Sequence, residues 1–171
     1  MSRGQRSEVK GQSKLLLVLL VLVACMERQP MQLEPPLVKA DGIVAYLVAT
    51  PTPKPNEYIV RAVARHGVAL EDPGSFVAAL HWTSATVTFV ADASDGGVVR
   101  VVAPSATTVR VAGASDQGIA SGELFAVRVR APASEHVNNL RLEITDLNDR
   151  SGVSMRSALV VVPAVTWTVP R

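Results

Sequence analysis

The sequence predicts an all-β sandwich of nine strands between residues 42 and 162. Three observations favour this fold class. Short runs rich in valine and other β-formers recur along this stretch, and clusters of Gly, Pro, Asp and Ser separate them. No segment carries a 3.6-residue apolar stripe over three helical turns. Many short strands with turn residues between them are typical of two packed sheets.

The predicted strands follow one another closely along the chain. In Leu140–Thr145 the apolar side chains alternate strictly with charged and hydroxyl side chains, as in a strand with one buried face. Residues 51–56, "PTPKPN", predict a loop or a sheet edge, because proline has no N–H to donate to a ladder. The nine strands are expected at 42–49, 57–65, 75–82, 86–91, 97–103, 107–114, 122–130, 139–146 and 155–162.

The first 24 residues predict a secretory signal peptide. Four basic side chains precede Leu15–Val23, an uninterrupted run of nine apolar residues. A membrane-spanning helix needs about 20 such residues, whereas the apolar region of a signal peptide takes roughly 7–15. The run is therefore too short to act as a membrane anchor itself.

The only cysteine of the chain follows this run directly. "LVAC", residues 22–25, resembles the lipobox of bacterial lipoprotein signals, and a thiolate suits acyl transfer because it is a strong nucleophile. The resemblance implies cleavage before Cys25, acylation of Cys25 and a lipid-anchored protein of the cell envelope, with residues 25–41 as a flexible tether. Met26 after the cysteine favours the outer membrane, with the protein facing the periplasm or the surface.

The charge of the chain gives little support for nucleic-acid binding. Of the 17 basic and 15 acidic residues, four and one lie in residues 1–25, which leaves 13 basic and 14 acidic residues in 26–171. The basic balance therefore belongs to the leader, and no basic patch interleaved with aromatics follows it.

Three stretches resemble the cohesin family. Residues 74–92, "GSFVAALHWTSATVTFVAD", are similar to a family strand of the form G-S-F-x-x-x-L-x-aromatic and the strand after it. Residues 113–131 are similar to the family's glycine and acidic loop followed by G-x-L-F, and residues 140–152 to its closing strand and turn. One departure is Thr83-Ser84, where the family usually has Asp-Pro.

The resemblance implies a nine-stranded jelly-roll β-sandwich over residues 42–163, with 164–171 as a C-terminal tail. It also implies a non-catalytic module without a cofactor. Cohesins bind dockerin modules through one sheet face, so the implied partner is a dockerin-like or envelope protein. The alternative is a carbohydrate-binding module of the related families 2 and 3, acting in polysaccharide binding or catabolism.

The carbohydrate-binding alternative requires exposed aromatic side chains, because flat rings stack on sugar faces. Four of them, Phe76, Trp82, Phe89 and Phe125, fall on alternating strand positions and are expected in the core. Trp167 lies beyond the last predicted strand and is the aromatic we expect to be exposed. It is therefore the candidate carbohydrate-binding residue.

Other candidate sites have a simpler interpretation. His66, His81 and His136 lack metal-ligand spacing, and Ser115 and Ser121 lack the G-x-S-x-G context of a hydrolase. "DLNDRSG", 146–152, resembles half of a calcium loop, but Arg150 and Ser151 occupy positions that need an oxygen ligand and a glycine. A turn made by Asn148 and Asp149 explains it better. "ADASDGG", 91–97, is likewise expected to be a turn, with Asp-Gly favouring a hairpin.

Overall fold

The computed structural model describes residues 36–83, 85–96, 98–120 and 122–168. The chain divides into two units, Met1–Met31 and Gln32–Arg171, and all described residues belong to the second. The predicted signal peptide, Cys25 and most of the predicted tether lie outside the described residues. Within the described part of the chain, no helix has the length and hydropathy needed to cross a bilayer.

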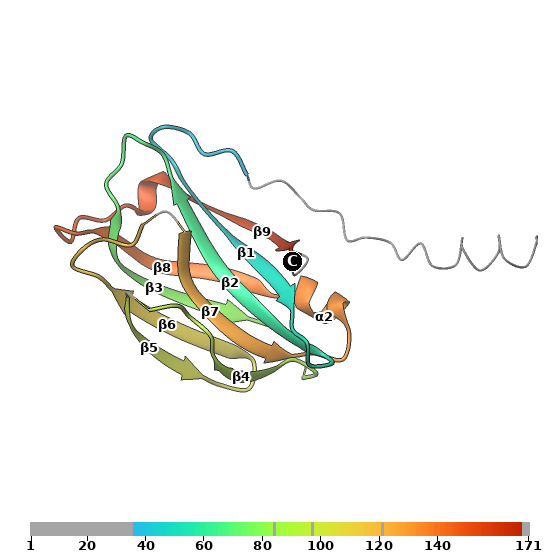
Figure 1. Cartoon of the computed structure of the whole chain (residues 1–171). Helices are drawn as coiled ribbons and strands as arrows, with labels where there is room; N and C mark the ends of the chain where they lie inside the picture. Colours follow the sequence, from blue (N-terminus) through green and yellow to red (C-terminus); the bar gives the residue numbers. More distant parts are fainter. Residues whose placement is uncertain (1–35, 84, 97, 121, 169–171) are drawn as a thin grey trace, which may run out of the picture. The chain divides into compact units, whose positions relative to one another are not determined.

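The second unit is a sandwich of two sheets (Figure 1). The five-stranded sheet has the order β4 (Thr88–Asp92), β7 (Gly122–Arg130), β2 (Glu57–His66), β1 (Ile43–Pro51) and β9 (Leu159–Trp167). The four-stranded sheet has the order β5 (Val99–Pro104), β6 (Thr108–Ala114), β3 (Pro73–His81) and β8 (Arg141–Asp149). Neighbouring strands are antiparallel except β1 and β9, which are parallel.

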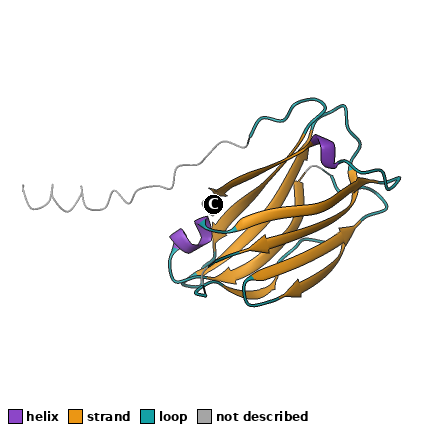
Figure 2. Cartoon of the chain, turned by 180° about the vertical axis from the view of Figure 1, so that it is seen from behind, coloured by secondary structure: helices purple, strands orange, loops and turns teal. Residues whose placement is uncertain are grey.

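Two short helical turns complete the fold, α2 (Ser134–Asn138) and the 3₁₀ turn η1 (Arg156–Ala158). The view from behind shows both turns in purple beside an otherwise β architecture (Figure 2). Neither was predicted, because five and three residues are too few to show a helical period. The predicted all-β jelly-roll sandwich of nine strands is confirmed.

The core lies between the two sheets and follows the period-2 pattern of the strands. Phe76 on β3 and Phe125 on β7 stack across it, with ring centroids 6.3 Å apart and planes 19° from parallel. Trp82 is 3% exposed, and its Nε1–H donates to the carbonyl oxygen of Ala106 at 3.0 Å. Phe89 is partly buried against the same core. The expectation of a core position is confirmed for Phe76, Trp82 and Phe125, whereas Phe89 packs against the core and stays partly exposed.

The last strand is longer and later than the sequence indicates. β9 runs to Trp167, so four residues assigned to a C-terminal tail belong to the sandwich. Pro163 does not end the strand, because β9 is an edge strand and its register against β1 shifts at this point. Val161 pairs with Ala45, and the next pair is Val165 with Leu47. Proline is tolerated in such bulges on sheet edges.

The segment "ADASDGG" is not the hairpin that its Asp-Gly pair predicts. It follows β4, an edge of the five-stranded sheet, and leads into β5, an edge of the four-stranded sheet. The connection therefore crosses from one sheet to the other. Local turn chemistry was outweighed here by packing, since β4 and β5, the strands on either side, belong to different sheets.

Candidate binding face

One side of the four-stranded sheet faces away from the core, and we call it the four-stranded face. Alternate residues of each strand point outward on this face, because their neighbours along the strand are buried in the core. Register aligns them in rows across β5, β6 and β3: Val99 with Ala114 and Ser75, then Val101 with Ala112 and Val77, then Ala103 with Arg110 and Ala79.

Apolar side chains are concentrated at the β5 side of this face. Val99 is 80% exposed, Val101 is 68% exposed and Val77 is 40% exposed. Ala112 lies between Val101 and Val77 in its row, and Ala114 lies beside Val99 in the next row, so the side chains on this part of the surface are short. Single exposed apolar residues are ordinary on a protein surface, but a contiguous exposed apolar patch marks an interaction site.

Polar side chains line the β8 side of the same face. His81 bridges two strands: its Nε2 lies 2.9 Å from Glu143 Oε2, and its Nδ1 lies 3.2 Å from Thr108 Oγ1. Thr145 donates from Oγ1 to the carbonyl oxygen of Val77 at 3.2 Å, and Asn148 donates from Nδ2 to Ser75 Oγ at 3.3 Å. These contacts order the margin of the face, and the apolar part stays open beside it.

The outer side of the five-stranded sheet is different in character. Glu57 is 3% exposed, and its carboxylate lies 3.3 Å from Arg128 Nε and 3.8 Å from Arg130 Nη2. Arg61 Nε lies 3.2 Å from Glu123 Oε2. These carboxylate and guanidinium groups pair with one another within the protein, which leaves the four-stranded face as the better docking surface.

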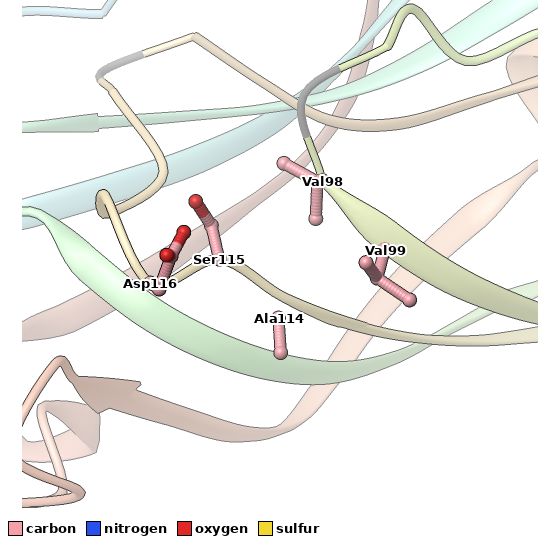
Figure 3. A pocket seen from close by; sticks show the side chains of 5 residues that line it. All are labelled: Val98, Val99, Ala114, Ser115 and Asp116. Carbon is pink, nitrogen blue, oxygen red and sulfur yellow. The ribbon is translucent and has the colours of Figure 1, made fainter.

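A hollow of about 740 Å³ lies at one end of the four-stranded face (Figure 3). Val98 and Val99 form its β5 side, and Ala114, Ser115 and Asp116 form its β6 side. The hydroxyl of Ser115 and the carboxylate of Asp116 give it polar groups beside an apolar wall. Such a combination suits an aliphatic side chain with a hydrogen-bond donor next to it.

The sheet-crossing connection behind this hollow is held by two side chains. Arg100 donates from Nε to the carbonyl oxygen of Leu124 and from Nη1 to that of Asp95, both at 2.7 Å. Asp92 Oδ1 accepts from the Ser94 Oγ–H at 2.7 Å and the Ser94 N–H at 3.0 Å. Partial burial raises the pKa of Asp92, but the Ser94 hydrogen bonds and the Arg100 charge outweigh it and leave the pKa below its usual value.

The histidines lie apart from one another and have local partners. His66 Nε2 lies 2.7 Å from Asp72 Oδ1, and its Nδ1 lies 3.2 Å from the carbonyl oxygen of Gly67. His81 belongs to the polar margin described above, and His136 lies on α2. Within the described residues, no three His, Cys, Asp or Glu side chains gather as a metal site would require.

The remaining candidate residues also have structural roles. Asp149 Oδ1 accepts from the N–H groups of Ser151 at 2.8 Å and Val153 at 2.9 Å, which confirms a turn at this acidic segment. Ser115 lines the hollow, and Ser121 lies outside the described residues. Asn148 faces Ser75 instead of contributing to the turn.

Trp167 is not the exposed aromatic that the sequence predicts. It is the last residue of β9, partly buried against the core, and its ring meets that of Tyr58 edge-on at 5.7 Å. Its Nε1–H donates to Asn138 Oδ1 of α2 at 2.7 Å. The error came from ending the last strand too early. A role of Trp167 in sugar binding stays a prediction.

Sequence reasoning missed the valines of the four-stranded face. A usable signal was present in "VVRVVAP", where Val99 and Val101 alternate with Arg100 and Val102. Both sides of such a strand are largely apolar, although a strand in a sandwich of two sheets faces the core on one side only. The outward set is then exposed, and the missing information was that the outer side of this sheet faces solvent.

Comparison with known proteins is informative at the level of structure. No family model matches the chain, and no curated protein matches its sequence. A non-cellulosomal cohesin from Archaeoglobus fulgidus superposes with a TM-score of 0.57 at 16% identity, covering 76% of this chain and 92% of the cohesin. The fold is cohesin-like.

Two further cohesins support this assignment. A cohesin solved in a type I cohesin–dockerin complex from Clostridium thermocellum gives a TM-score of 0.54 at 10% identity, covering 75% of this chain and 99% of that one. A cohesin from Clostridium acetobutylicum gives 0.52 at 11% identity, covering 77% and 92%. At these identities the likeness establishes the cohesin-like fold, and the ligand must be argued from the face itself.

Proposed function

We propose that this cohesin-like domain is a non-catalytic binding module, tethered to a membrane through acylated Cys25, that recognises a protein partner on its four-stranded face. The observation that carries the proposal is the group of exposed valines on one face, Val99 and Val101 on β5 and Val77 on β3, with small alanines of β6 between the two strands. An apolar patch on the β5 side, with an ordered polar margin on the β8 side, is the kind of surface found in protein–protein interfaces.

The solved neighbours add support for a protein partner. The Clostridium thermocellum neighbour was solved as a cohesin–dockerin complex, and the Clostridium acetobutylicum neighbour, CaCohA2, was also solved in complex with CaDoc0917, at a TM-score of 0.53. A dockerin-like module is therefore the first class of partner to test. The hollow beside Val99 would receive an aliphatic anchor residue of that partner, with Asp116 available to a neighbouring donor.

Affinity capture with the whole protein tests the face. Wild type, the double variant V99D/V101D and the control V153D are compared for recovery of envelope and secreted proteins. Val153 is 63% exposed but lies in the loop after β8, so V153D adds a charge at a similar exposure off the face. We expect a partner that V99D/V101D loses and V153D keeps. Equal recovery by all three proteins would place the contact elsewhere.

Polysaccharide binding is the less supported alternative. Among the described residues, the exposed large apolar side chains are all leucine or valine, and no row of exposed rings is available for sugar stacking. Retention on a panel of insoluble polysaccharides tests this directly. Binding that survives V99D/V101D but is lost in W167A would favour the carbohydrate module over the protein-binding module.

A further inference from the structure

Three large apolar side chains at one end of the sandwich are exposed to solvent and do not belong to the core. Leu37 and Val68 are each 98% exposed, and Val160 is 60% exposed. They come from three separate parts of the chain: the segment before β1, the connection from β2 to β3, and the start of β9. We call these three residues the end patch.

Hydrogen bonds and a shared hollow bring these three segments together. The N–H groups of Gly67 and Ala69 donate to the carbonyl oxygens of Gly42 and Ala40, both at 2.9 Å, which places the Val68 loop beside the segment that carries Leu37. Leu37 and Val160 line one hollow of about 430 Å³. The three segments meet at the end of the sandwich opposite α2 and the end of β9 (Figure 1).

Packing also fixes the loop in this place. A Cβ added at Gly67 would come 2.1 Å from the carbonyl oxygen of Lys39, so only glycine allows the two segments to approach so closely. These close backbone contacts hold the loop of Val68 against the segment that carries Leu37. The apolar side chains of the end patch are exposed to water.

The charges around the end patch cancel. Lys39 and Arg65 are exposed near it, and so are the acidic Asp41 and Glu71. A nucleic acid or a strongly charged partner would need an excess of one sign. The end patch instead suits an uncharged apolar environment, and contact with it should be insensitive to salt.

The short stretch of chain between Cys25 and the described residues indicates what covers the end patch. Cys25, the proposed site of acylation, is eleven residues before Pro36, the first described residue. Eleven residues span at most about 40 Å even when fully extended. A domain held so close to a bilayer meets its surface at a high effective concentration, so a small apolar contact is enough to orient it.

We propose that the end patch docks on the surface of the bilayer that holds the acyl chains of Cys25. Leu37, Val68 and Val160 enter the boundary between headgroups and acyl chains, and each favours the docked state by roughly a factor of ten where it is fully buried. The proposal rests on the lipidation in the proposed function. Docking by this end leaves the four-stranded face along the side of the domain, open to a partner.

Fluorescence of a single label tests the proposal with the full lipidated protein in phosphatidylethanolamine–phosphatidylglycerol vesicles. Cys25 is blocked by its thioether, so an added cysteine takes the label alone. Ala69→Cys places the label beside the end patch, and Ser134→Cys places it on α2 at the other end. We expect spin-labelled lipids to quench the label at residue 69 several-fold more than the label at residue 134, in low salt and in about 0.5 M salt alike.

Substitutions separate docking from other causes of quenching. L37S/V68S/V160S should reduce quenching at residue 69 to about a tenth or less, whereas V77S/V99S/V101S, the same kind of change on the four-stranded face, should leave it unchanged. Quenching that is equal at both labels, or that survives L37S/V68S/V160S, overturns the proposal. Quenching that depends on protein density in the vesicle also overturns it, because a second copy then covers the patch.

Vesicle flotation distinguishes this proposal from the one on which it rests. A protein that does not float refutes the lipid anchor and, with it, the docked state. A protein that floats with an unquenched label at residue 69 refutes only the docking of the end patch, and the proposed partner binding stands.

Discussion

The ring of Phe76 occupies the space that a side chain on Gly113 would need. A Cβ at Gly113 would come 2.3 Å from Phe76 Cε1 and 2.6 Å from Cζ. Gly113 and Phe76 are paired across β6 and β3, and the ring continues from there to its stack with Phe125 of the other sheet. The glycine therefore leaves room for the stack of Phe76 on Phe125 in the core, directly behind the four-stranded face.

Replacing Gly113 with alanine should destabilise the protein. The added methyl group collides with a ring that is itself packed on both sides, and overpacking of this kind costs about 1–3 kcal/mol. Urea unfolding at equilibrium measures the free energy of unfolding of G113A. Gly96→Ala is the matched control, because nothing lies within 4 Å of its added Cβ. An unchanged midpoint for G113A would contradict the contact.

Arg100 should be needed for the connection between the two sheets. In R100A the carbonyl oxygens of Leu124 and Asp95 lose charged donors, and each such hydrogen bond contributes about 1.5–3 kcal/mol at most. We expect a lower free energy of unfolding and faster hydrogen exchange in residues 93–100. Arg110→Ala is the control: this arginine is exposed on the adjacent β6. Similar losses in both variants would show a general charge effect instead.

The sequence predicts the features of this fold that depend on neighbouring residues better than those that depend on pairing between distant strands. Strands such as β7 and β8 were predicted closely, because apolar and polar residues alternate within 122–130 and 139–146 themselves. The parallel pairing of β1 with β9 joins residues more than a hundred positions apart, and no pattern within either strand predicts it. The length of β9 was missed for the same reason, since proline is expected to end a strand and only the pairing with β1 shows that Pro163 lies in a bulge of β9.

The candidate site was harder to predict than the fold. A run such as "VVRVVAP" reads as a buried strand, because apolar residues on both sides usually mean packing on both sides. Val99 and Val101 are exposed because they lie on the outer side of the four-stranded sheet, as Val77 on β3 does, and the sequence of β5 does not show which of its sides faces the core. Trp167 shows the reverse: an aromatic near the end of the chain was expected to be exposed, yet it packs on Tyr58.

Removing Cys25 should release the protein from the membrane. In C25S the thiol needed for acyl transfer is absent, so we expect the protein in the membrane fraction of wild-type cells and not in that of cells making C25S. Mass spectrometry of the wild-type N-terminal peptide should show Cys25 as the first residue with added acyl mass. A wild-type protein that is soluble, or cleaved at another position, would contradict the predicted lipoprotein signal.

Stability in acid should depend on Asp92. Its pKa in the folded protein is below the ordinary value of 3.8, so the folded state binds this proton less readily than the unfolded state does. The stabilising contribution is therefore complete above about pH 4 and is lost as the pH falls through the lower folded pKa. We expect D92N to lose less stability than wild type between neutral pH and about pH 3, measured by urea unfolding at each pH.

Ser94→Ala provides the second arm of this test. Its hydroxyl supplies the 2.7 Å hydrogen bond to Asp92 Oδ1, while its backbone N–H donor is retained. S94A should therefore fall between wild type and D92N in its acid sensitivity. Because Asp92 is largely exposed, the effect should shrink in high salt, where the attraction of Arg100 is screened but the hydrogen bonds stay. Identical pH profiles for wild type, S94A and D92N would show that Asp92 contributes nothing to acid stability.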